Sequence, residues 1–245
     1  MSIPNQCENI SGNNSVEIID LINPKSNSSF LNDDLVHMHF TNGGGLIQGE
    51  PIICGGYNYI MKKTSKNVIP VRQPNKNKSN LLIERGWGAA SMVLKLNDIE
   101  NLWITGGRGK TTEFVSIDQP PVSGPTLPFF AEGHTMEYVD DKIMIIGGYQ
   151  DGEPSNKTWI IDPTKDFEVV EGPLMNDKRT CHSSATMNMD GRKFIVVVGG
   201  FNKDSQWFKE PCDVSVELLD ITSSSLKWKE GKDLLDFWKI IIHFI

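Results

Sequence analysis

The chain has few residues of the kinds that mark disulfide-rich or membrane-spanning proteins. Its four cysteines, in 245 residues, include no CxxC pair, so neither a disulfide scaffold nor a paired-cysteine zinc site is expected. No apolar run reaches the roughly 18 to 20 residues that cross a bilayer, so we expect no membrane insertion. The first residues lack a basic start followed by an apolar segment, which predicts a cytoplasmic protein.

Basic residues are in the minority. The chain holds 24 Lys and Arg against 31 Asp and Glu, a net charge of -7. Phosphate contacts need clustered Lys and Arg on one face, so the sequence predicts no nucleic-acid partner. The one basic stretch, residues 62–78, is interspersed with Asn, Ser and Pro, which is typical of a solvated loop.

Motifs of catalysis and cofactor binding are also missing. The sequence has no GxSxG elbow, no HExxH pair and no Walker sequence ending in GK[ST], which predicts a protein that is not an enzyme and uses no cofactor. His134 and His182 stand at corresponding places in the chain, and His37 and His39 are two residues apart. Neither pair has the further ligands of a metal site, so all four are interpreted as non-ligating histidines.

A repeated pattern is what the chain does have. An apolar run ends in two glycines four times, with the first glycine at positions 55, 106, 147 and 199 and spacings of 51, 41 and 52 residues. A short β-prone run stopped by Asp follows each of the last three pairs, as in residues 113–118, 157–162 and 215–220. A similar run at residues 15–20 has no glycine pair before it.

Two further elements complete the repeat. A turn signal with Gly, and in two cases Pro, follows the next short strand at residues 124–127, 172–175 and 231–234. Small residues precede the apolar runs at residues 86–90, 132–136 and 180–184, where they permit tight packing near an axis. Four short strands in 40 to 50 residues cannot bury their faces alone, but radially stacked blades can.

These residues resemble the kelch repeat family, whose blades carry an apolar strand, a glycine pair, and later a Tyr and a Trp. Tyr57 and Tyr149 follow two of the pairs, and Trp159 and Trp228 stand at later positions of two repeats. The resemblance implies an all-β, kelch-type β-propeller with blades of four antiparallel strands. It also implies that the glycines are turn residues of the architecture: Gly55, Gly56, Gly106, Gly107, Gly147, Gly148, Gly199 and Gly200.

The repeats amount to about four and a half blades, fewer than the six or so that are usual for the family. We therefore expect an incomplete propeller over residues 1–234 that begins within a blade. Residues 235–245 are expected to be an atypical C-terminal tail or the start of a truncated blade, because no glycine pair follows there.

The resemblance implies a non-catalytic module that binds another protein through its rim loops. Such a module serves as the recognition part of a ubiquitin-ligase adaptor or as an actin-associated protein. Exposed aromatic residues among charges are typical contact anchors. The candidate contact residues lie in one long connection: Trp207, Phe208, Lys203 and Lys209.

Two alternatives remain. A secreted, glycosylated kelch-like protein would use the Asn-x-Ser/Thr acceptor patterns, which begin at Asn9, Asn13, Asn27, Asn77 and Asn156. A propeller enzyme resembling galactose oxidase would need a ligand set of Tyr, Cys and His. The chain has four tyrosines, and none stands in such a pattern.

Overall fold

The described part of the chain is built almost entirely from β-strands. The computed structural model describes residues 43–58, 63–72, 79–86, 88–107, 109–202 and 214–231. One short 3-10 helix, η2 (Pro163–Lys165), interrupts the strands. Within these residues no helix is long and apolar enough to cross a membrane.

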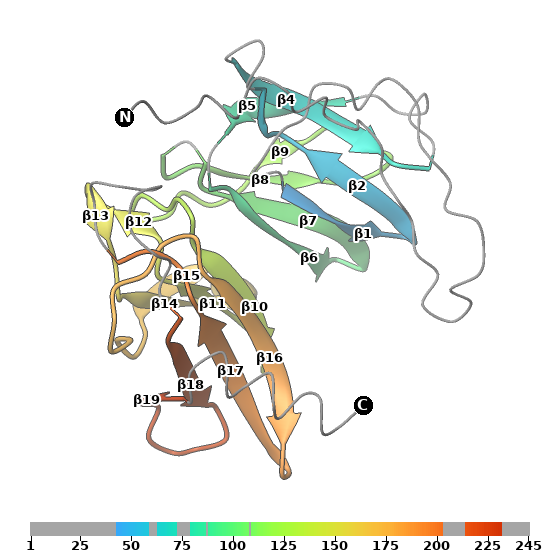
Figure 1. The fold of residues 1–245 in the computed structure, drawn as a ribbon. Helices are drawn as coiled ribbons and strands as arrows, with labels where there is room; N and C mark the ends of the chain where they lie inside the picture. The colour runs from blue at the N-terminus through green and yellow to red at the C-terminus, as the bar shows by residue number, and fades with distance from the viewer. Residues whose placement is uncertain are drawn as a thin grey trace, which may run out of the picture.

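The described strands form four larger antiparallel sheets, which we call blades 1 to 4 in chain order, and one two-stranded ribbon (Figure 1). Blade 1 comprises β1 (Gly43–Ile47), β2 (Glu50–Cys54), β4 (Lys63–Pro70) and β5 (Ser79–Arg85), with β3 (Tyr57–Asn58) also paired to β4. Blade 2 comprises β6 (Ala90–Leu96), β7 (Ile99–Thr105), β8 (Thr112–Val115) and β9 (Val122–Ser123). Each strand of blade 2 pairs with the next one along the chain.

Blades 3 and 4 repeat this order. Blade 3 comprises β10 (Thr135–Val139), β11 (Lys142–Ile146), β14 (Thr158–Asp162) and β15 (Glu168–Glu171). Blade 4 comprises β16 (Ser183–Met189), β17 (Arg192–Val198), β18 (Val216–Asp220) and β19 (Trp228–Glu230). A two-stranded ribbon of β12 (Tyr149–Gln150) and β13 (Glu153–Pro154) leaves blade 3 between its second and third strands.

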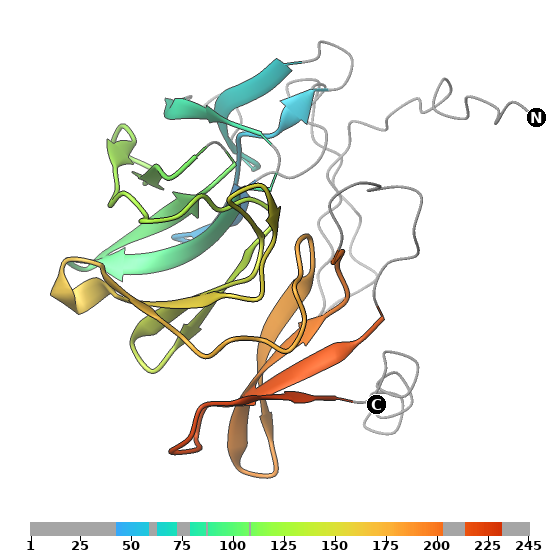
Figure 2. The same cartoon turned by 90° about the vertical axis from the view of Figure 1, so that its left-hand side faces the viewer.

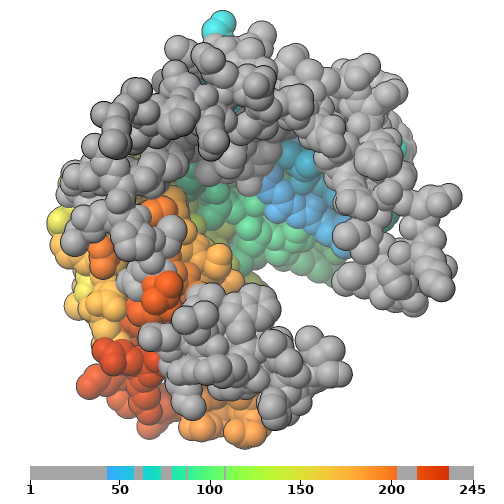
Figure 3. Space-filling model, viewed as in Figure 1, coloured from blue at the N-terminus to red at the C-terminus, as the bar shows by residue number. Residues whose placement is uncertain are grey.

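The first strands of the four blades lie next to one another. β1 lies beside β6, β6 beside β10, and β10 beside β16. The blades follow one another along a curve, from blue to red in Figures 1 and 2, and the space-filling view shows the same curve (Figure 3). This is the arrangement of propeller blades around an axis, with the first strand of each blade innermost.

Each inner hairpin is closed by a turn of two residues with positive φ. The turn of blade 2 is Asn97-Asp98, with φ of 49° and 64°, and that of blade 3 is Asp140-Asp141, with φ of 48° and 62°. Positive φ at both central residues is the type I′ turn, whose twist matches the flanking strands. Blades 1 and 4 use Gln48-Gly49 and Asp190-Gly191 in the same way.

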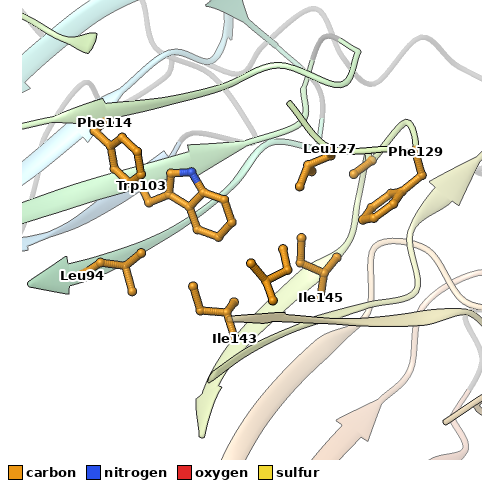
Figure 4. Packing of buried hydrophobic residues seen from close by; sticks show 9 residues of the cluster. Leu94, Trp103, Phe114, Leu127, Phe129, Ile143 and Ile145 are labelled. Atoms are coloured by element: carbon orange, nitrogen blue, oxygen red, sulfur yellow. The ribbon is translucent and has the colours of Figure 1, made fainter. Parts of the chain in front are cut away.

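Three apolar cores fill the three junctions between neighbouring blades. The 1–2 core includes Ile52 and Leu102, and the 3–4 core includes Ile146 and Leu219. The 2–3 core is drawn in Figure 4; its buried members are Leu94, Trp103, Phe114, Leu127, Phe129, Ala131, Ile143, Ile145 and Ile161. The second strands of blades 2 and 3 contribute side chains to the cores on both of their sides, which explains their continuous apolar runs.

The predicted fold class is confirmed for the described residues: they are all-β, and their blades have four antiparallel strands, with β3 as a fifth strand in blade 1. One detail of the repeat differs. Trp159 lies in the third strand of blade 3, whereas Trp228 lies in the fourth strand of blade 4, so the two residues are not equivalent. Residues 15–20 and the predicted tail, residues 235–245, lie outside the described residues.

Candidate functional site

The two ends of the blades differ in what they carry. Strands alternate in direction, so the two-residue turns lie at one end of each blade and the glycine pairs at the other. We call these ends the hairpin face and the loop face. The connections between blades also lie on the loop face, because the fourth strand of a blade ends there and the first strand of the next begins there. Connecting loops on a rigid scaffold are where binding residues concentrate.

All eight glycines of the pairs have positive φ, between 56° and 100°. The first glycine of three pairs also lies close to the backbone that leads into the next blade: a Cβ on Gly55 would lie 2.8 Å from the carbonyl oxygen of Arg85. A Cβ on Gly106 would collide with the carbonyl oxygen of Ala131, and one on Gly147 would lie 2.7 Å from the carbonyl oxygen of Arg179. A side chain is therefore excluded twice at these positions, by φ and by space. These contacts fix where each loop begins.

Backbone hydrogen bonds join the connections near the axis. The amide of Gly133 donates to the carbonyl oxygen of Gly88 at 2.8 Å, and the amide of Cys181 donates to that of Gly133 at 2.7 Å. These residues precede the first strands of blades 2, 3 and 4. A Cβ on Gly133 would lie 2.5 Å from Thr180 Oγ1, so the small residue permits the approach.

Two buried ion pairs near the loop face join neighbouring blades, one at the 1–2 junction and one at the 3–4 junction. Arg85, at the end of β5, places Nε 2.6 Å from Glu113 Oε1 on β8 of the next blade, with both side chains 1% exposed. Its Nη1 donates to the carbonyl oxygens of Gly106 and Thr111 at 2.6 and 2.9 Å. The arginine therefore holds the glycine-pair loop of blade 2 from blade 1.

The 3–4 junction repeats this arrangement. Arg179 Nε lies 3.1 Å from Glu217 Oε1 on β18, and Nη1 donates to the carbonyl oxygens of Gly199 and Ser215. The second Glu217 oxygen accepts the amide of Asn176 at 2.7 Å. Buried charges with partners and additional hydrogen bonds of this kind are costly to break, because the remaining charge stays buried.

The 2–3 junction uses aromatic rings in place of this ion pair. Ala131 occupies the position of the arginine: it accepts the amide of Gly107, as Arg85 accepts that of Gly56. Trp159 occupies the position of the glutamate, because it faces Ile145 on β11 as Glu113 faces Ile104 on β7. The ring of Trp159 stacks on Phe129 at a centroid distance of 4.4 Å and an interplanar angle of 12°.

Sequence reasoning missed these four charged residues. Their signal is a shared offset: Glu113 and Glu217 each stand two residues after a residue whose carbonyl oxygen accepts from the arginine, Thr111 and Ser215. Arg85 and Arg179 each stand just before the small residues that lead into the next blade. The variable length of the loops hides the pattern, because the partners are 28 and 38 residues apart.

His134 and His182 are buried at equivalent places on the loop face. His134 Nε2 lies 2.7 Å from Thr105 Oγ1, and His182 Nε2 lies 3.0 Å from Thr135 Oγ1, so each imidazole joins two blades. Burial lowers the pKa of His134 to about 4, and burial together with the positive charge of Arg179 lowers that of His182 to about 3. Both rings are neutral near pH 7. The described residues contain no cluster of three His, Cys, Asp or Glu that could hold a metal ion.

The hairpin face has its own repeated contact. Asp162 ends the third strand of blade 3, where its carboxylate accepts from Thr164 N and Oγ1 at 3.1 and 2.6 Å and pairs with Lys142 Nζ at 2.8 Å. Asp220 makes the same contacts in blade 4, with Thr222 and Arg192. This explains why an Asp stops these strands: it caps the turn and binds a cation on the second strand. The Lys142 and Thr164 hydrogen bonds lower the pKa of Asp162 to about 2.

The residues predicted to contact a partner, Trp207, Phe208, Lys203 and Lys209, lie outside the described residues. The same is true of four of the five glycosylation patterns, those at Asn9, Asn13, Asn27 and Asn77. The fifth is described: Asn156 Nδ2 donates to the carbonyl oxygen of Met175 at 3.1 Å, and the Thr158 hydroxyl of the same pattern is buried and donates to Pro173. Both polar groups are engaged within the fold.

Large apolar side chains are exposed on the loop face. Phe130 is 49% exposed in the connection from blade 2 to blade 3, and Leu174 is 61% exposed in the connection from blade 3 to blade 4. The buried thiol of Cys54, by contrast, has its pKa raised to about 12, chiefly by burial, and is unreactive in this environment. The described loop face therefore offers apolar contacts and hydrogen bonds on a fixed framework.

Comparison with known proteins agrees with this architecture. The family model of the Kelch motif matches residues 132–166, which run from the loop-face connection through the second and third strands of blade 3. No curated protein matches the sequence. Kelch motifs are typical of β-propellers that mediate protein interactions and are typically non-catalytic. The chain thus contains a Kelch motif in blade 3, and its described residues form four consecutive blades, as in an incomplete kelch-type β-propeller.

Proposed function

We propose that the chain is a protein-binding module whose loop face contacts the partner. The observation that carries this proposal is that exposed apolar residues belong to connections held in place by buried neighbours. Next to the exposed Phe130, Phe129 is buried and its ring stacks on Trp159. Next to the exposed Leu174, Met175 is buried; its amide donates to the carbonyl oxygen of Asn156, and its carbonyl oxygen accepts from Asn156 Nδ2. Anchors held on a rigid scaffold lose little entropy on binding.

The test compares substitutions on the two faces. Phe130→Ser with Leu174→Ser removes apolar surface from the loop face, and the control, Ile99→Ser with Leu46→Ser, removes exposed apolar residues near the turns of the hairpin face. Proteins retained by each tagged chain from cell extract are identified by mass spectrometry. We expect a set of proteins that the loop-face variant loses and the hairpin-face variant keeps. Loss from the hairpin-face variant alone would contradict the proposal.

The proteins retained by the chain distinguish two more specific roles for the module. If the protein is the recognition part of a ubiquitin-ligase adaptor, we expect a cullin to be retained together with the target; if it is an actin-associated protein, we expect it to sediment with actin filaments. Both are extensions of the same proposal, because each uses the propeller to recognise a protein. Sedimentation with filaments and immunoblotting for cullin separate them.

We propose a cytoplasmic location for the module. The engaged side chains of Asn156 and Thr158 make this acceptor pattern a poor glycosylation site, and Cys54 and Cys181 are free thiols, as expected in a reducing compartment. Endoglycosidase treatment of the native protein tests this. An unchanged mobility on gels is expected, and a shift to lower mass would favour the secreted alternative.

A further inference from the structure

The connection between the third and fourth strands of blade 4, which we call the serine turn (residues 221–227), carries three consecutive serines, Ser223 to Ser225. We propose that Ser225 is a phosphorylation site for a protein kinase that selects basic residues after the serine. The serine turn lies on the hairpin face, away from the loop face proposed to bind the partner. Either proposal can therefore fail without the other.

The serine turn is exposed along most of its length. β18 ends at Asp220, β19 begins at Trp228, and every residue from 222 to 227 is exposed. The two ends are held in place, because Ile221 packs against the 3–4 core and Trp228 is 2% exposed. Figure 2 shows the turn, in red, projecting from the end of blade 4. An enzyme can thus reach the middle of this segment without separating the blades.

The corresponding turn of blade 3 is held down by an aromatic ring. The register of the fourth strands places Leu226 of blade 4 where blade 3 has Phe167. The ring centroid of Phe167 lies 5.4 Å from that of Trp103 and 5.6 Å from that of Phe114. Leu226, in contrast, is 40% exposed. An exposed leucine holds a turn less firmly than a packed ring, so the serine turn can be drawn into an extended form at low cost.

The hydroxyl of Ser225 is available for reaction. Within the described part of the chain, nothing hydrogen bonds to it. The neighbouring hydroxyls are engaged: Ser223 Oγ accepts the amide of Ser225 at 3.3 Å, and the Thr222 hydroxyl donates to Asp220 at 2.6 Å.

Two lysines follow Ser225 at intervals of two residues. Lys227 and Lys229 flank Trp228, whose side chain is buried, and both lysines are exposed. Residues two apart in an extended segment lie on the same side, so Ser225 and the two lysines share one side when the turn is extended, and Ser224 falls on the other. A kinase with carboxylates beside its catalytic site can then contact both ammonium groups while the hydroxyl faces ATP.

The spacing to a lysine does not select the site by itself. Ser155 also stands two residues before a lysine, Lys157, but it is 8% exposed and its hydroxyl oxygen accepts the amide of Lys157 at 3.1 Å. Thr164 is exposed beside a lysine, but its hydroxyl donates to Asp162 at 2.6 Å. Ser225 combines an exposed turn, an unengaged hydroxyl and basic residues on its own side.

The phosphoryl group comes from ATP, which the kinase binds with Mg²⁺. Ser225 Oγ forms a bond with the γ-phosphorus, the bond between this phosphorus and the β,γ-bridging oxygen breaks, and ADP leaves. The hydroxyl proton passes to the catalytic aspartate of the kinase. The product carries about two negative charges near pH 7 on the side of Lys227 and Lys229.

The test incubates the folded full chain with the catalytic domain of protein kinase C, Mg²⁺ and ATP, and locates phosphate by mass spectrometry of peptides. We expect phosphate on Ser225. Ser225→Ala should lower the initial rate of incorporation by at least about tenfold, whereas the matched control, Ser224→Ala, should keep it within about twofold. Phosphate mainly on Ser224 or Ser155, or none on the chain, would overturn the inference.

A second pair of variants tests the role of the lysines. Lys227→Gln with Lys229→Gln removes both charges and is expected to lower kcat/KM of the kinase for the chain by at least about tenfold. Lys227→Arg with Lys229→Arg keeps the charges and should leave kcat/KM within about threefold. Thermal unfolding verifies that all variants are folded. An unchanged kcat/KM for the glutamine variant would contradict the proposal, because the kinase would then not read the lysines.

Discussion

Arg179 and Glu217 form an ion pair with no exposed surface on the arginine, and they join blades 3 and 4 at the loop face. Arg85 and Glu113 make the same contact between blades 1 and 2. In both pairs the arginine also binds the carbonyl oxygens at the start of the next blade's loop. The position of each loop is therefore set by the blade before it.

Arg179→Met is expected to lower the free energy of unfolding by about 3 to 5 kcal/mol, because Glu217 remains buried without its partner. Urea unfolding followed by tryptophan fluorescence measures the change. The matched control is Lys178→Met, whose partner Glu153 is solvent-exposed and whose loss is expected to cost at most about 1 kcal/mol. Equal losses in the free energy of unfolding would show that the buried ion pair stabilises the fold no more than the exposed one.

Gly106→Ala is expected to lower stability by more than about 2 kcal/mol, since a positive φ and a collision with the Ala131 carbonyl act together. Gly152→Ala separates the two causes, because Gly152 has φ of 93° but a Cβ added there would meet nothing within 4 Å. Its expected cost is about 1 kcal/mol. The difference in melting temperature between the variants reports the steric part alone.

Stability is expected to fall as the pH is lowered from about 6.5 to about 4. Unfolded histidines take up protons below 6.5, whereas in the folded state His134 and His182 stay neutral until about 4 and about 3. The unfolded state therefore binds more protons in this window, and the free energy of unfolding decreases. His134→Gln with His182→Gln should flatten the dependence measured by urea unfolding at several pH values, and each single variant should remove part of it. A pH dependence unchanged in the double variant would be a contrary result.

Asp162→Asn is expected to lower the melting temperature at pH 7 and to lose this effect in acid. The folded pKa of Asp162 lies at about 2, below its usual value of 3.8, so its contribution is present above 3.8 and is lost as the pH falls toward 2. Calorimetry at pH 7 and pH 2.5 compares it with Asp98→Asn, which removes a carboxylate 97% exposed beside Lys95. A pH-independent difference from the wild-type chain would rule out the charge as the cause.

The sequence predicted those parts of the fold whose signal lies in a few consecutive residues and recurs from repeat to repeat. The apolar runs before Gly55, Gly106, Gly147 and Gly199 correspond to the second strands of the blades. In blades 2 and 3 this strand is buried on both sides, which requires a continuously apolar run. The turns of the inner hairpins were not among the predicted elements, although their signal is equally local, because Asn-Asp, Asp-Asp and Asp-Gly favour positive φ.

Contacts between blades were not predictable in the same way. Arg85 and Glu113 are 28 residues apart, and Arg179 and Glu217 are 38 residues apart, so no fixed spacing in the sequence indicates these contacts. Trp159 is the clearest example. The sequence does not show that this tryptophan occupies the position of a glutamate, where its stacking on Phe129 takes the place of an ion pair at the 2–3 junction.

The constant two-residue turns have an evolutionary consequence. Because each described inner hairpin has a turn of only two residues, differences in length between repeats must lie in other loops. The ribbon of β12 and β13 shows that the stretch after a glycine pair accepts inserted residues. New loops can thus be added without shifting the axis of the blades. Binding specificity in this chain can diverge by insertion while the framework stays unchanged.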